Sequence, residues 1–214
     1  MGLGIGLGIV RNVAGDDEGE AWARSSLQKL QAALAAEGIE GWTEAEQIDP
    51  PDAGMRRHTS SFPYSFLHYL RRAYAIRATG EAVLPTHSEA DLESASRIVE
   101  DEASMLSSHL LCHSDAEGYY VPVAFGDPCF LDASAGVAGA GMVGSSVTLL
   151  GELRALAPAI GITLEPDGTL SDAEAARLAA VREGSPWLRE HTVWLALHER
   201  CRASVRYGLT IVFC

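Results

Sequence analysis

The first ten residues alternate strictly between glycine and aliphatic side chains. Every second position is aliphatic, and these positions are Leu3, Ile5, Leu7 and Ile9. A period of two predicts a β-strand over residues 3–10, with one apolar face and one bare face. Because glycine weakens a strand, the bare face indicates that another backbone or a helix packs close to it.

Four further segments carry short alternating or continuous apolar patterns that predict strands. They are residues 39–48, 119–125, 160–164 and 209–213. The segment at 209–213 is apolar except for Thr210, so we expect that strand to lie at or near the centre of the sheet.

Apolar residues at intervals of three and four predict helices between these strands. The helices are expected to start near Asp16, Phe62, Asp91, Ser145, Ser171 and Ser185. The helix from Asp91 either continues to His113 or breaks near Ser107. We therefore predict a single α+β domain over residues 1–214, with a mixed β-sheet and about five packed helices.

Charge narrows the range of partners. The chain of 214 residues has 16 Lys and Arg against 29 Asp and Glu, which gives a formal net charge of −13. This balance argues against nucleic acid or an anionic membrane as the direct partner and favours a basic protein. A hydrophobic content of 47% excludes a disordered chain. No apolar run reaches the roughly 18 residues that a membrane span needs.

The cysteines indicate a reducing compartment. They are scattered, form no Cys-x-x-Cys pair, and stand at positions 112, 129, 201 and 214. The apolar N-terminus has no basic segment before it and no cleavage site after it, so it is a poor signal peptide. We expect a bacterial, cytoplasmic protein with free thiols.

The densest group of polar side chains lies between His109 and Tyr120. If one helix runs through it, His109 and His113 lie four residues apart on one face and can bind a divalent metal, with Asp115 as a third ligand and Glu117 as a base. A metal-free acid–base site would use His113, Asp115 and Glu117. Alternatively the segment is a tight turn, in which His113 and Asp115 bond to backbone groups. No other cofactor is expected.

This segment carries a resemblance. His113-Ser114-Asp115 followed by Glu117-Gly118-Tyr119 resembles a string in uncharacterised bacterial proteins, some of them immunity-like or accessory proteins. The resemblance covers about a dozen residues and implies no catalytic role. A cysteine often stands in that string where this chain has Ala116, which removes one nucleophile.

Residues 134–144 are rich in glycine, and 139–144 match the G-x-G-x-x-G pattern of dinucleotide-binding folds. Too few residues follow for a full fold of that kind, so a mobile loop before a capped helix is the favoured interpretation. The backbone donors of such a helix N-terminus would suit an anionic group.

Two islands of arginine stand out in the acidic chain, at 56–57 and 71–72. They could receive a carboxylate or a phosphate. Pairing with local acids such as Asp49, Asp52 or Glu81 is the favoured alternative.

Two functions remain open. The first is a non-enzymatic cytosolic binding protein, of immunity or accessory type, that recognises a basic partner. The second is a small metal-dependent or acid–base enzyme that uses His109 to Glu117. In either case we expect the functional surface to combine the turn at 109–120 with residues 55–68 and the glycine segment at 134–146. The idle polar residues there include His58, His68, Tyr119 and Ser145.

Overall fold

The computed structural model describes residues 2–13, 15–44, 56, 59–86, 88–139 and 141–213. Its six strands are β1 (Gly2–Leu7), β2 (Ser61–Pro63), β3 (Gly118–Val121), β4 (Cys129–Phe130), β5 (Met142–Ser145) and β6 (Ile211–Phe213). They form one sheet in the order β2-β1-β6-β3-β5-β4. Only β3 and β5 pair in parallel, so the sheet is mixed. The expectation that the C-terminal strand lies near the centre is confirmed.

Seven α-helices surround this sheet in the described part of the chain. They are α1 (Asp17–Ala36), α2 (Tyr64–Ala78), α3 (Glu89–Ser104), α4 (His109–Cys112), α5 (Ser146–Leu156), α6 (Asp172–Ala179) and α7 (Leu188–Tyr207). Single 3-10 turns lie at Arg11–Val13, Ala133–Ala135 and Ala157–Ile160. The α+β fold with a mixed sheet is as predicted, with more helices than the expected five.

The predicted caps position several of these helices. The Ser145 hydroxyl accepts the N–H of Thr148 at 3.0 Å, and the Ser171 hydroxyl accepts the N–H of Glu174 at 3.2 Å. Helix α7 ends at Gly208, whose φ of +68° is a left-handed conformation that favours glycine.

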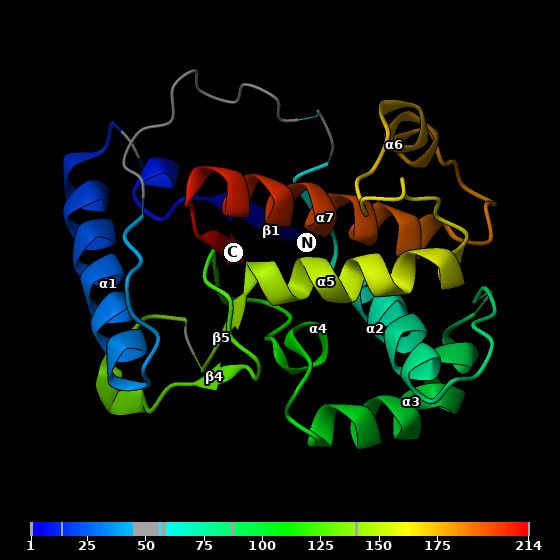
Figure 1. Ribbon diagram of the computed structural model, residues 1–214, viewed down its shortest axis with the longest axis horizontal. Helices are drawn as coiled ribbons and strands as arrows, with labels where there is room; N and C mark the ends of the chain where they lie inside the picture. Colours follow the sequence, from blue (N-terminus) through cyan, green and yellow to red (C-terminus); the bar gives the residue numbers. More distant parts are fainter. Residues whose placement is uncertain are drawn as a thin grey trace.

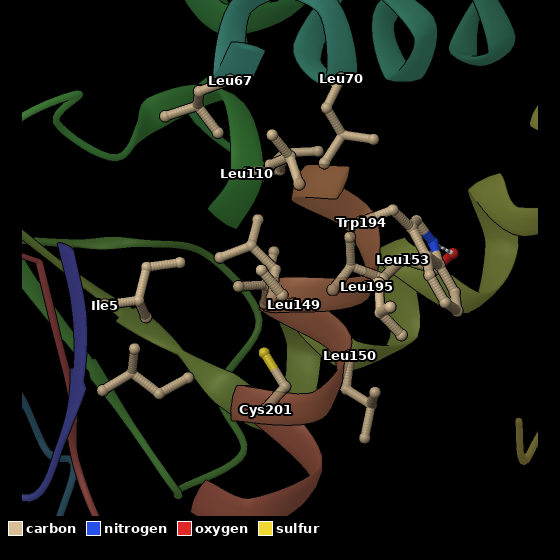
Figure 2. Packing of buried hydrophobic residues seen from close by; sticks show 14 of the residues in the cluster. Ile5, Leu67, Leu70, Leu110, Leu149, Leu150, Leu153, Trp194, Leu195 and Cys201 are labelled. Atoms are coloured by element: carbon tan, nitrogen blue, oxygen red, sulfur yellow. Dashed lines mark hydrogen bonds between the residues drawn. The ribbon is translucent and has the colours of Figure 1, made fainter. Parts of the chain in front are cut away.

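The two faces of the sheet carry different helices. Leu3, Ile5 and Leu7 of β1 pack against α2, α5 and α7, and α5 and α7 run side by side (Figure 1). Figure 2 shows Leu149, Leu153 and Trp194 inside this cluster, where the Trp194 indole donates to the Leu153 carbonyl at 2.8 Å. On the opposite face, Leu30 and Leu34 of α1 pack in a second cluster with Tyr119, Val121 and Val143.

Two predicted strands are wrong. Residues 160–164 form no strand, because the 3-10 turn ends at Ile160 and Gly161 adopts a φ of +70°. Residues 39–44 are irregular, and 45–48 lie outside the described residues. The first strand is shorter than expected, since Gly8 turns away with a φ of +84°.

Three strands were not predicted, and β5 lies inside the segment interpreted as a loop. Gly144 stands opposite Tyr120 in the parallel pairing of β3 with β5. A Cβ at Gly144 would lie 2.3 Å from the Tyr120 ring, so only glycine allows this approach. The glycine therefore serves sheet packing, and no dinucleotide-binding loop is formed.

Candidate functional site

The segment after α4 is held by a buried arginine of α2. Arg71 donates from Nε to the Leu110 carbonyl at 2.9 Å, and its other nitrogens bond to the His113 carbonyl and to Asp115. On the outer side, His68 Nε2 lies 3.4 Å from Asp115 Oδ2. Arg71 thus fixes the turn through one carboxylate and two carbonyl groups.

His113 lies inside the protein beneath this turn. Its ring stacks on Tyr120 at 4.1 Å and meets the edge of Phe213 at 4.6 Å. Nδ1 lies 3.0 Å from the Ser114 carbonyl, whereas Nε2 has no hydrogen-bond partner among the described residues. Burial lowers the pKa of His113 to about 4, so the ring is neutral at physiological pH. Gly118 is required above it, because a Cβ there would lie 2.9 Å from the ring.

His109 has a structural position as well. Its Nδ1 accepts the N–H of Ser145 at 2.8 Å, and its Nε2 lies 3.0 Å from the Gly126 carbonyl. Burial lowers the pKa of His109, which agrees with a neutral ring that donates from Nε2. Both nitrogens are therefore used by the fold.

The metal hypothesis, with His109, His113 and Asp115 as ligands, gains no support from this geometry. It required one helix through both histidines, but α4 ends at Cys112 and His113 has an extended backbone. Within the described ranges, no group of three or more His, Cys, Asp or Glu side chains could hold a metal ion.

The segment that contains the three residues proposed for acid–base chemistry makes the contacts expected of a turn. The Ser114 hydroxyl accepts the N–H groups of Ala116 and Glu117 at 3.2 and 3.4 Å. Asp115 pairs with α2, whereas His113 is enclosed and Glu117 is exposed. A catalytic role for His113, Asp115 and Glu117 stays a prediction.

Glu117 opens onto a hollow of about 680 Å³, which we call the Glu117 hollow. Residues of β1, β3, β6, α1 and the loop before β5 line it, including Trp22, Tyr119 and Phe213. Gly139, also in the lining, has a φ of +70°, and a Cβ there would lie 3.3 Å from Glu117 Oε2. The glycine makes room for the carboxylate at the wall of the hollow.

The three segments predicted to form one functional surface do contact one another, but only some of their polar residues are exposed. The turn at 109–120 contacts α2 through His68 and the glycine segment through Glu117, and His109 bonds to Ser145. His113 and Ser145 are buried, however, so they offer no exposed chemistry. His58 lies outside the described residues.

The predicted anion site at the start of α5 gains no support from the geometry. The N–H of Ser145 donates to His109 and that of Thr148 donates to the Ser145 hydroxyl, inside the core. Of the arginine islands, Arg56 and Arg71 pair internally, although with other acids than expected: Arg56 bonds to Asp172 and Glu199 at 2.8 and 2.9 Å, and Arg71 pairs with Asp115. Arg57 lies outside the described residues.

The helix predicted from Asp91 is present as α3, but its exposed carboxylates were not predicted as a candidate binding surface. It carries six carboxylates and one arginine, Arg97, and only Ala95 is buried. Three of the carboxylates, Glu89, Glu93 and Glu100, are exposed and lie on one side of the helix, and we call them the α3 acidic face. The density of carboxylates between positions 89 and 102 is visible in the sequence, but it enters the prediction only through the net charge. In Figure 1, α3 lies along one edge of the molecule, far from α1.

These features define an α+β protein that presents carboxylates on an exposed helix. A family model described as "Putative DNA-mimic protein" matches residues 1–213. Because the match covers nearly the whole chain, the protein belongs to this family. Comparisons with curated proteins and with solved structures gave no match. None of the helices in the described ranges is long and apolar enough to cross a membrane.

Proposed function

We propose that the protein binds a basic, DNA-binding protein and occupies its DNA-binding surface with the α3 acidic face. The observation that carries the proposal is the stripe formed by Glu89, Glu93 and Glu100. At 100° per residue these positions fall within about 40° of one another around the helix axis. All three side chains are exposed.

The spacing along this stripe suits a surface made for phosphates. With a rise of about 1.5 Å per residue, Glu93 lies about 6 Å from Glu89 and Glu100 about 10.5 Å further on. Successive base pairs of B-DNA advance by about 3.4 Å, so these intervals are close to two and three steps. A basic groove that binds phosphates would meet carboxylates at similar intervals.

The net charge of −13 supports the same partner, because it would attract a basic protein at low salt. The family description favours a DNA-binding protein as the partner over the toxin that an immunity-type protein would neutralise. No step of this function needs a metal or a catalytic residue.

The test is capture of proteins on the immobilised chain, with DNA as competitor. We expect the wild-type chain to retain DNA-binding proteins at low salt and to release them when duplex DNA or salt is added. The variant E89Q/E93Q/E100Q should retain far less.

A control variant separates the α3 acidic face from bulk charge. E37Q/E165Q/E183Q removes the same number of exposed carboxylates at scattered positions and should capture as the wild type does. Equal loss in both variants would show that only net charge matters. Unchanged capture by the α3 variant would contradict the proposal.

A further inference from the structure

The Glu117 hollow lies outside the α3 acidic face, and its lining selects for one kind of ligand. Most of the lining is apolar, contributed by side chains such as Tyr119, Val212 and Phe213. Glu117 is the charged residue of the lining, and no lysine, arginine or histidine is among the described residues that form it. An anion would find no cationic partner there.

The rim adds an aromatic face and further negative charge. Trp22 lines the hollow although 55% of its surface is exposed, which is unusual for a side chain so apolar. It belongs to the acidic first turns of α1, where Asp17 and Glu18 precede it by five and four residues. A tryptophan face attracts cations, and nearby carboxylates strengthen that preference.

Neighbouring groups fix the side of the hollow that carries Glu117. Gly139 leaves space for the carboxylate, and Tyr119, two residues after Glu117, donates its hydroxyl to the Ala138 carbonyl at 2.9 Å. The pKa of Tyr119 is raised by burial and by the neighbouring charge of Glu117. The tyrosine hydroxyl therefore stays protonated beside Glu117.

We infer that the Glu117 hollow takes an arginine or lysine side chain of a basic protein partner. The apolar walls contact the aliphatic stem, Trp22 contacts the cationic group and Glu117 pairs with it. This inference rests on the proposed function for the basic character of the partner. It adds a second contact, on another part of the molecule than α3.

The experiment titrates the full chain with short peptides and follows it by NMR. Four six-residue peptides differ at one central residue: arginine, lysine, citrulline, which is a neutral analogue of arginine, and norleucine, which is apolar. We expect the arginine and lysine peptides to shift the Trp22 indole signal and the amide signals of Gly118 and Val212. Citrulline should bind at least fivefold more weakly.

Two variants test the residues. Glu117→Gln should weaken the arginine peptide by roughly three- to tenfold, which corresponds to the loss of one charged contact at a partly exposed site. Trp22→Ala should weaken it by about two- to fivefold, as expected for an exposed cation–aromatic contact. The matched control Glu183→Gln, a distant exposed carboxylate, should leave it unchanged.

The outcomes separate this inference from the proposed function. If norleucine or citrulline binds as well as arginine, the hollow is a site for apolar ligands and the inference is wrong. If no peptide shifts these signals, the inference is also wrong, while loss of capture by E89Q/E93Q/E100Q would still support the proposed function. Peptide binding that survives in that triple variant supports two separate contacts.

Discussion

Helices α3 and α7 both carry several ionisable side chains, but these are mostly exposed in α3 and partly buried in α7. In α7, twelve of 20 residues are buried, among them Glu190, His191, His198 and Glu199. In α3, one of 16 residues is buried, and four of the six carboxylates are fully exposed. Helix α7 is the centre of the fold, whereas α3 contributes little to the core.

The difference lies in the partners of the charges. Glu199 accepts hydrogen bonds from Arg56, His198 and Arg202 at 2.9, 3.1 and 2.8 Å. On α3 the single arginine lies 3.9 Å from Asp101, and both side chains are exposed. A buried charge must be paired to be tolerated, whereas an exposed one is free to bind a partner. Charge in α7 therefore serves stability, whereas we propose that charge in α3 serves recognition.

The largest expected effect is in the core around α7. Trp194→Ala should lower the free energy of unfolding by about 3–5 kcal/mol, because it leaves a cavity and removes the bond to the Leu153 carbonyl. Urea unfolding measures this change. Val99→Ala, at a half-buried position of α3, should cost much less. Equal costs at the two sites would mean that α3 belongs to the core.

Glu199 provides a test in which pH is the variable. Although burial alone would raise its pKa, hydrogen bonds from His198 and Arg202 outweigh burial and lower the pKa to about 2 from the usual 4.5. Since the folded pKa is the lower one, the stabilisation is complete above about pH 4.5 and is lost as the pH falls towards 2. Glu199→Gln should cost ~3 kcal/mol at pH 7 and little near pH 2, as measured by denaturant unfolding across this range.

Glu190, on the same helix, is the control, because its effect on stability should depend on pH in the opposite direction. Burial raises its pKa, and its carboxylate accepts the Thr86 hydroxyl at 3.0 Å. The wild type should lose stability relative to Glu190→Gln as the pH rises above the usual carboxyl pKa. The same pH profile for both variants would contradict this view of α7.

The sequence predicted the longer helices and the strands β1, β3 and β6, because their signals are local. Alternation in β1, the caps at Ser145 and Ser171, and the stop at Gly208 each depend on neighbouring residues.

Long-range contacts set the remaining parts and could not be seen in the sequence. β5 exists because Gly144 admits the ring of Tyr120, more than 20 residues earlier in the chain. The two ring nitrogens of His109 contact Gly126 and Ser145, and Asp115 pairs with Arg71, all of them distant in the sequence. The acidic stripe of α3 was visible locally, but the prediction concentrated on histidines.

Substitution of Leu106, just after α3, should have a smaller effect on the free energy of unfolding, and this effect should be stabilising. Leu106 is 53% exposed and adopts a φ of +55°, a left-handed backbone that costs an L-residue free energy. Leu106→Gly should therefore stabilise the protein by about 0.5–1 kcal/mol, offset in part by the flexibility of glycine in the unfolded chain. Met105→Gly, at an ordinary helical φ of −69°, should destabilise it. Thermal unfolding of both variants checks the sign.

The smallest effect on stability belongs to the α3 acidic face, and it is the sharpest test of the comparison. E89Q/E93Q/E100Q removes exposed charges that repel one another, so the free energy of unfolding should change by no more than about 0.5 kcal/mol per position. The same variant should lose most of its affinity for the captured partner, and the slope of affinity against salt should fall. Chemical unfolding and a salt titration of binding measure both quantities on one sample. A variant that unfolds easily would show that α3 supports the fold, and one that keeps the wild-type salt slope would place the contact elsewhere.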